Sequence, residues 1–298
     1  MAAITEPQLG PNLQEPAGWR RTKNRMATVA MVVAFVLVII PLVFVLYTVV
    51  VKGIKVISWS FVTSGPIPPA VVPANVGGIG PAVLGTFLIV AIATAMAVPL
   101  GVLGAIYLNE YGGKGVLGRL IGFMSDVMTG VPSIVMGLFI FSIWVLHFQY
   151  SGFAGALALG CLMLPVVIRS TDEMLKLVPN SLREGSYALG ATKARVTMTV
   201  VLPAAIGGIV SGALLAIARA AGETAPLLFT ILTVATANPN PFSGPNTSLP
   251  SQIFANATSP YTGAQDRAWG TALTLIVIAF VFMIAARIVT ARFTRYSR

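Results

Sequence analysis

Residues 169–197 read RSTDEMLKLVPNSLREGSYALGATKARVT, a polar stretch set between two apolar runs at 153–168 and 200–221. Most short membrane proteins have no need of so long a connection. The stretch predicts one short helix over 183–189. Gly190 is placed to end that helix as the left-handed residue that follows a C-cap.

The predicted short helix has features of its own. Asn180 or Ser181 is the expected N-cap, and Leu182, Tyr187 and Leu189 are apolar positions in an otherwise polar segment. A helix of this length cannot cross a bilayer. It either docks into a groove of a partner protein or lies on lipid headgroups, and its composition leaves both interpretations open.

Composition places the two flanking runs in a membrane. The chain has 298 residues, of which 56% are hydrophobic and 9% charged, and its mean hydropathy is +0.86. An ordinary soluble domain is about a quarter charged. Because a spanning helix needs about 20 mainly apolar residues, the sequence predicts an all-α polytopic membrane protein with six transmembrane helices. Their ranges are 26–51, 83–108, 124–147, 153–168, 200–221 and 269–289.

Basic residues are unevenly distributed between the predicted spans. When the N-terminus, the second and fourth loops and the C-terminus share one side, the other side holds only Lys52, Lys55 and Arg267. The positive-inside rule then predicts that both termini are cytoplasmic. The predicted segments are a cytoplasmic N-terminal tail over 1–25 and a six-helix transmembrane domain over 26–298, which contains a cytoplasmic loop over 169–199.

The remaining loops and the rare residue types limit the chemistry. The outer loops 52–80 and 238–267 are rich in Gly, Pro and Asn and are expected to form irregular caps. The single Cys161 and the single His147 exclude a disulfide framework and argue against a metal site.

The fifth predicted span carries two charges, Arg219 and Glu223, in the string ARAAGETAPLLFT. Residues four apart lie on nearly the same face of a helix, so the two can pair. One interpretation is a buried ion pair that fixes helix packing; the other is a cation that faces a polar pathway and binds an anion. Gly222 and Pro226 are expected to break or bend the helix beside the pair, and the Thr224 hydroxyl is a further candidate donor.

Two more charged residues lie near the predicted inner boundary. Arg169 follows the fourth span and is either a second anion contact or an ordinary positive-inside anchor. Asp126 is interpreted as an acid near the N-terminus of the third span, with pairing to a basic loop residue as the alternative.

The polar stretch also resembles a known signature. Glu184 is followed by two small residues, Gly190 comes six residues after it, and Leu202 and Pro203 follow at the spacing of the Glu-Ala-Ala…Gly…Ile-x-Leu-Pro signature of bacterial ABC importer permeases. Here the alanines are replaced by Gly185 and Ser186, and the isoleucine by Val200. The strings VPLGVLGAIYLNEY, VPSIVMG and ARAAGETAPLLFT are similar to the phosphate-specific branch, and GETAPLLFT is similar to its PstA-type permeases.

This resemblance implies a type I ABC importer permease with a MetI-like core, in the bacterial inner membrane. It implies a phosphate pathway past Arg219, Glu223, Thr224 and Arg169. Contact with an ATPase is implied for Leu182, Arg183, Glu184, Gly185, Ser186, Tyr187 and Gly190. The implied partners are a PstC-type permease, two PstB-type ATPase subunits, a PstS-type phosphate-binding protein and membrane lipids, with no nucleic acid.

The sequence disfavours two other function classes. An ion-coupled secondary phosphate transporter would use Glu223 as its proton site, but the chain has a single acid at depth and no visible inverted repeat. An intramembrane enzyme lacks a histidine cluster and a G-x-S-x-G motif. The chain also lacks a P-loop sequence, so we expect it to bind no cofactor and to rely on a separate ATPase for ATP and Mg²⁺.

Overall fold

The computed structural model describes residues 18–67, 76–112 and 115–295, and all secondary structure in these ranges is helical. Most of the predicted tail, part of the first outer loop and Lys114 lie outside them. The chain divides into two units, residues 1–50 and residues 51–298. The first unit consists, where it is described, of most of helix α1 (Gly18–Gly53), an apolar segment that contains Pro41.

Among the residues that the structure describes, five helical segments are long and apolar enough to cross a membrane. They are 21–53, Gly80–Gly112, Gly152–Lys176, Lys193–Ala221 and Thr262–Ile284. They match five of the six predicted spans, because continuous apolar length is the property that lipid selects. In the second unit they contain α3 (Gly80–Ile106), α7 (Gly152–Lys176), α10 (Leu202–Ala221) and part of α13 (Thr262–Arg295).

The third predicted span is not one helix. Instead, α4 (Val116–Gly130) and α5 (Ser133–Ile140) are separated by Val131 and Pro132, and the two halves of this segment are bent by 107°. Proline lacks a backbone donor and disfavours helical geometry in the residue before it, and Val131 is extended at φ −72° and ψ 126°. The prediction of a single helix over 124–147 was therefore wrong. A π-helical turn η2 (Phe141–Val145) and the short α6 (Leu146–Phe148) complete the second half.

The connection between α7 and α10 is more helical than predicted. Residues 169–176 belong to α7, which extends two turns beyond the expected end at 168. After α8 (Asn180–Ala188), the helix resumes with α9 (Lys193–Val196) and a π-helical turn η3 (Thr197–Val201) that leads into α10. Only short non-helical links remain in the predicted loop over 169–199. A third π-helical turn, η1 (Tyr107–Gly112), extends α3.

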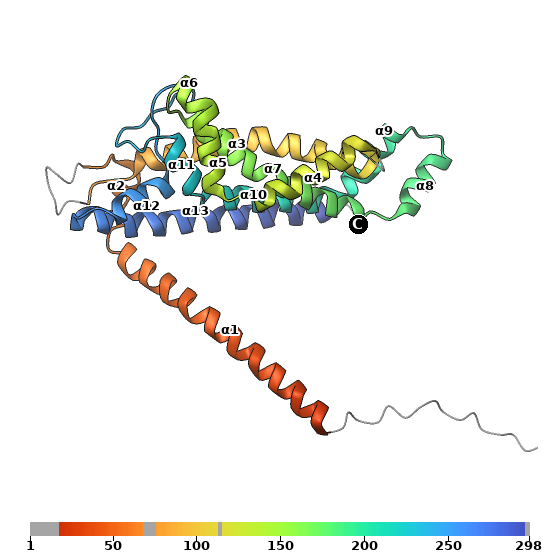
Figure 1. The fold of residues 1–298 in the computed structure, drawn as a ribbon, viewed down its shortest axis with the longest axis horizontal. Coiled ribbons are helices and arrows are strands. Elements are labelled where there is room, and N and C mark those ends of the chain that lie inside the picture. The colour runs from red at the N-terminus through yellow and green to blue at the C-terminus, as the bar shows by residue number, and fades with distance from the viewer. Residues whose placement is uncertain (1–17, 68–75, 113–114, 296–298) are drawn as a thin grey trace, which may run out of the picture. The chain divides into compact units, whose positions relative to one another are not determined.

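Helix α7 lies at the centre of the second unit (Figure 1). Its residues Leu159 and Val167 are fully buried in a cluster with Ile89 of α3 and Ala220 of α10. The small residues of α10 allow close approach, since a Cβ on Gly212 would lie 2.6 Å from Cβ of Ser170. The small residues of α10 thus pack against another span of the same chain.

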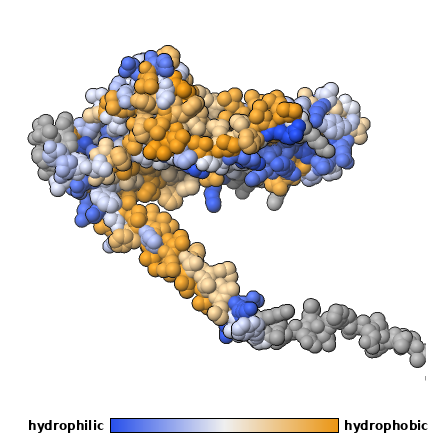
Figure 2. All heavy atoms as spheres, viewed as in Figure 1, coloured by the Kyte–Doolittle hydropathy of each residue, from blue (hydrophilic) through white to orange (hydrophobic). Residues whose placement is uncertain are grey.

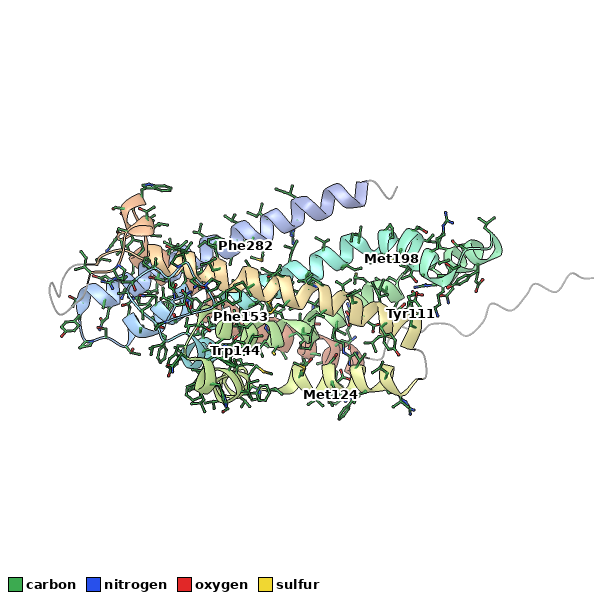
Figure 3. All side chains as sticks on the ribbon, turned by 90° about the horizontal axis from the view of Figure 1, so that it is seen from above. Tyr111, Met124, Trp144, Phe153, Met198 and Phe282 are labelled. Carbon is green, nitrogen blue, oxygen red and sulfur yellow. The ribbon has the colours of Figure 1, made fainter. Side chains whose placement is uncertain are left out.

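The two ends of the second unit differ. Helices α8 and α9 lie at one end, and α2 (Trp59–Thr63), α6 and α12 (Leu249–Ala257) lie towards the other (Figure 1). Figure 2 shows hydrophobic residues over the middle of this unit and hydrophilic ones gathered towards the α8 end. Aromatic side chains also join elements: the rings of Trp144 in η2 and Phe153 in α7 are 5.0 Å apart between centroids (Figure 3).

The end that carries α12 is more regular than the predicted irregular caps. Ser248 and Ser251 form a capping box at the start of α12, and the N–H of Leu249 donates to Oγ1 of Thr86 in α3 at 2.8 Å. Arg267 in α13 is only 3% exposed. It donates to the carbonyl of Val76 and, at 2.8 Å, to that of Ile67, which fixes the first outer loop to α13.

Candidate functional site

Arg219 and Glu223 pair as the sequence predicts. Arg219 lies in the last turn of α10, and its Nε is 3.6 Å from Oε1 of Glu223. This is an ion pair that is too long to count as a hydrogen bond. The Arg219 side chain is 70% exposed and that of Glu223 is 22% exposed in the chain taken alone. The guanidinium is therefore open to whatever lies beside this face and is not sealed among side chains.

The helix breaks at this pair. Helix α10 ends at Ala221, and α11 (Ala225–Thr230) begins after Thr224, with Pro226 in its first turn. Glu223 and Thr224 stand in the break, and the Thr224 side chain does not cap α11. The break predicted from Gly222 and Pro226 is confirmed, and it leaves polar backbone and side chains beside Arg219.

The pair lies near the middle of the bundle. A small recess is lined by Arg219 and Glu223 together with Leu162, Met163 and Val166 of α7, and these three occupy the middle of that 25-residue helix. A charged arginine at the centre of a spanning helix costs roughly 2.5–3.5 kcal/mol on insertion scales. So exposed a cation at this level needs water, an anion or another chain beside it.

The break at Pro132 brings its following helix against the break between α10 and α11. Helix α5, which follows the bend at Pro132, packs against α11. A Cβ on Gly137 would lie 2.6 Å from Cα of Pro226, so the backbones of the two broken spans are in close contact. The glycine of the string VPSIVMG is explained by this approach.

Arg169 and Asp126 form a further ion pair, which joins α7 to α4; their side chains are 45% and 58% exposed. The alternative that paired Asp126 with a basic residue is confirmed. The prediction of Asp126 as a helix N-terminal acid was wrong, because α4 begins ten residues earlier, at Val116. Leu162, Val166 and Arg169 have the spacing i, i+4, i+7 of a single helix face. Arg169 therefore follows the Arg219 recess along α7 in the direction of α8.

Apolar side chains of α8 and of the residue after it are exposed, and Tyr187 among them also lines the cleft that holds Arg183. Leu182 is 46% exposed, Tyr187 40% and Leu189 90%, and Glu184 and Gly185 are exposed beside them. Gly190 has φ +78°, as predicted for the residue after the C-cap. The helix begins at Asn180 instead of 183, and its N-cap is Pro179.

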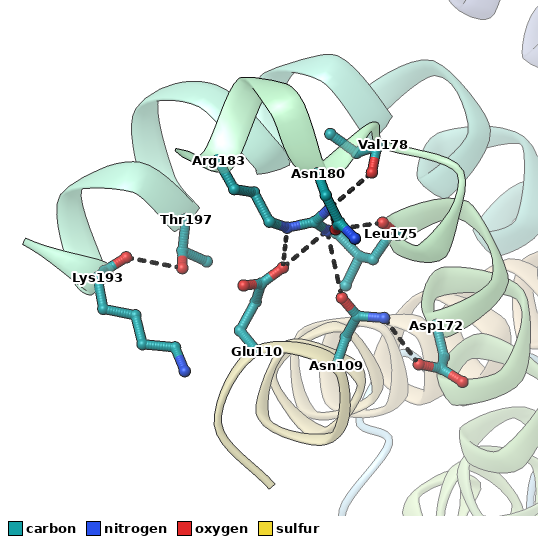
Figure 4. A network of polar contacts seen from close by, with 9 residues as sticks. All are labelled: Asn109, Glu110, Asp172, Leu175, Val178, Asn180, Arg183, Lys193 and Thr197. Carbon is teal, nitrogen blue, oxygen red and sulfur yellow. Dashed lines mark hydrogen bonds and ion pairs between the residues drawn. The ribbon is translucent and has the colours of Figure 1, made fainter. Parts of the chain in front are cut away.

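The N-cap prediction was wrong because the side chain expected to cap has another partner. Oδ1 of Asn180 accepts a hydrogen bond from Nη1 of Arg183 at 3.3 Å. Arg183 in turn is only 13% exposed and points into the bundle, away from the outer surface of α8 (Figure 4). The prediction that Arg183 contacts the ATPase therefore does not fit the position of its side chain. It lies in an open polar cleft, whose other lining residues are Asn109, Glu110, Lys176, Asn180, Tyr187 and Lys193.

Glu110 is the functional candidate that the sequence reasoning missed. It lies in η1 with its side chain 5% exposed, and its Oε1 is 3.0 Å from Nη2 of Arg183. The one available signal was an acid at the end of an apolar span, in the string YLNEY. No local spacing connects it to Arg183, which is 73 residues away in the sequence.

Comparison with known proteins assigns the family. Residues 97–295 match the family of binding-protein-dependent transport system inner membrane components. The chain is 44% identical over 285 residues to the phosphate transport system permease protein PstA 1 of Mycobacterium tuberculosis, covering 94% of this chain and 91% of that one. It is 41% identical over 280 residues to PstA of Yersinia pestis, covering 92% of each. The chain belongs to the PstA permease family.

Solved structures place the fold of this PstA family member among importer permeases. An inward-facing chain of the MetNI methionine ABC transporter superposes with a TM-score of 0.58 at 17% identity, covering 76% of this chain and 99% of the other. A chain of a bacterial alginate ABC transporter superposes with a TM-score of 0.63 at 13% identity, covering 94% and 99%. The predicted MetI-like core is confirmed.

Proposed function

We propose that this chain is the transmembrane permease subunit of an ATP-driven inorganic phosphate importer and forms half of its translocation pathway. The observation that carries the proposal is the exposed Arg219 at the middle of the bundle, in a chain whose relatives are named phosphate transport permeases. The chain is a transport subunit and not an enzyme.

Arg219 is suited to a dehydrated oxyanion. A guanidinium stays protonated and can donate two parallel hydrogen bonds to phosphate oxygens, which replaces part of the water that the anion sheds. Glu223 neutralises Arg219 when the pathway is empty and weakens retention when phosphate is bound. It also accepts a hydrogen bond from a protonated phosphate oxygen. Thr224, in the helix break, adds a hydroxyl donor.

Arg169 is the proposed second contact. It lies on the same face of α7 as the residues that line the Arg219 recess, and the axial separation from Val166 is about 4.5 Å for three residues of helix. Phosphate that leaves Arg219 in the direction of α8 passes Arg169, where Asp126 occupies the guanidinium between transport events.

The proposed assembly supplies what this chain lacks. A PstC-type permease forms the other half of the pathway and covers the exposed side of α10. Two PstB-type ATPase subunits bind and hydrolyse ATP with Mg²⁺, and one of them binds the exposed apolar side chains of α8. A PstS-type protein delivers phosphate from outside. Both termini and α8 then lie in the cytoplasm of a bacterium, and the chain is embedded in its plasma membrane.

Reconstitution tests this function directly. The permease pair and the ATPase are purified together, placed in proteoliposomes and supplied with the phosphate-loaded binding protein and radioactive phosphate. We expect uptake that requires ATP hydrolysis and is abolished by vanadate. Uptake that follows a proton or sodium gradient without ATP would instead identify the secondary transporter.

A further inference from the structure

Arg183 connects three elements at the cytoplasmic end proposed above. From α8 it donates through Nε and Nη2 to Oε1 of Glu110 in η1, at 3.2 and 3.0 Å. It also donates to the carbonyl of Leu175 in α7 at 2.9 Å and to that of Val178, just after α7, at 2.5 Å. A single guanidinium thus holds α8, the end of α3 and the end of α7 together (Figure 4).

A neighbouring amide extends this contact. Oδ1 of Asn109 accepts from Nη2 of Arg183, and Nδ2 of Asn109 donates to Oδ1 of Asp172 in α7, both at 3.4 Å. Asn109 and Glu110 belong to the π-helical turn η1, a type of distortion that often occurs at functional sites. Within the described residues, the polar contacts of α8 with the transmembrane helices thus converge on Arg183.

Stability alone is a poor reason for such a pair. Burying two opposite charges costs desolvation that their attraction repays only in part, and apolar replacements of both partners are often as stable. The pair fixes the orientation of α8 instead, because the planar guanidinium of Arg183 can donate its hydrogen bonds in only a few geometries. The arrangement therefore holds α8 at one position relative to α3 instead of letting it slide on an apolar surface.

We propose that Glu110 and Arg183 are positioning residues that form a joint, through which displacement of α8 reaches α3. The joint makes α8 and the end of α3 move as one body during transport. This inference rests on the importer function proposed above and names the residues that transmit its motion within this chain.

Packing continues the connection from α3 to the phosphate site. A Cβ on Gly101 of α3 would lie 2.7 Å from Cγ1 of Val167 in α7, so α3 and α7 are in close contact and displacement of α3 acts on α7 at this point. The residue before Val167, Val166, lines the recess of Arg219. A shift of α8 thereby changes the surroundings of the anion-binding guanidinium without any direct contact between them.

The first test compares Glu110→Gln with Glu173→Gln in the reconstituted complex. Glu173 is a matched control because it is an exposed glutamate of α7 that does not line the cleft of Arg183. We expect Glu110→Gln to lower phosphate uptake per ATP hydrolysed at least about tenfold, since a buried Arg183 loses its counter-charge. The ATPase should still co-purify, and Glu173→Gln should match the wild type.

Two results would overturn the joint. One is an unchanged ratio of uptake to hydrolysis in Glu110→Gln. The other is loss of the ATPase from that variant, which would make the pair a mere anchor of α8. Absence of ATP-driven uptake in the wild-type complex would count against the proposed function itself, so the two failures are distinguishable.

A distance measurement tests the joint without relying on transport. Spin labels are placed at Ser181 of α8 and at Leu103 of α3, which is 63% exposed, in a Cys161→Ser background that removes the single native cysteine. With Glu110 intact, we expect ATP to leave the distance between the labels unchanged. With Glu110→Gln, ATP should shift it. A shift with Glu110 intact, or none in either protein, would refute the proposal.

Discussion

Replacing Gly137 by alanine tests whether the two broken spans need close backbone contact. The new Cβ would lie 2.6 Å from Cα and 3.0 Å from the carbonyl oxygen of Pro226, whereas ordinary contact begins at 3.4 Å. Both atoms are backbone, so no side chain can rotate away and α5 must separate from α11. Overpacking of this kind costs about 1–3 kcal/mol. Because Glu223 lies three residues before Pro226, the separation also moves the carboxylate relative to Arg219.

The matched control is Gly122→Ala in α4, where the added Cβ meets nothing within 4 Å. Both substitutions gain the same helix propensity, roughly 0.5–1 kcal/mol for Gly to Ala, so the difference between them isolates the contact with Pro226. Thermal unfolding of the purified complex, with phosphate uptake measured in parallel, should show Gly137→Ala destabilised and less active relative to Gly122→Ala. Equal stability and equal uptake in the two variants would refute the close approach.

Two further changes test the two ends of the second unit. Leu182→Asp puts a charge on the exposed apolar surface of α8, and we expect the ATPase to be lost on co-purification; full retention would contradict the docking role. Arg267→Met removes the donors to the carbonyls of Val76 and Ile67, and a hydrogen bond to a charged group contributes about 1.5–3 kcal/mol. We expect faster limited proteolysis of the first outer loop, and an unchanged cleavage rate would show that other contacts hold it.

Local patterns in the sequence predicted the features that depend on neighbouring residues. Five spans follow from apolar length alone, the Arg219–Glu223 pair follows from spacing on one helix, and the left-handed Gly190 follows from its place after a short helix. In each case the determining residues lie within one segment, so no knowledge of packing was needed.

Features that depend on packing between segments were missed. The third predicted span bends at Pro132, and α5 beyond the bend packs against α11. Asn180 does not cap α8, because its side chain accepts a hydrogen bond from Arg183 instead. The guanidinium of Arg183 is in turn positioned by Glu110, which lies in a distant helix. Such competition between local and long-range partners has no periodicity that a single sequence can show.

Phosphate uptake by a complex that carries Arg219→Gln tests the central claim, that phosphate crosses the bundle in contact with the exposed guanidinium of Arg219. The complex that carries this variant should assemble with its ATPase and hydrolyse ATP, because the Arg219 side chain is mostly exposed and packs little within the chain. We expect phosphate uptake into proteoliposomes to be abolished while all subunits co-purify in normal proportions. Normal uptake, or loss of assembly in place of loss of uptake, would contradict the account.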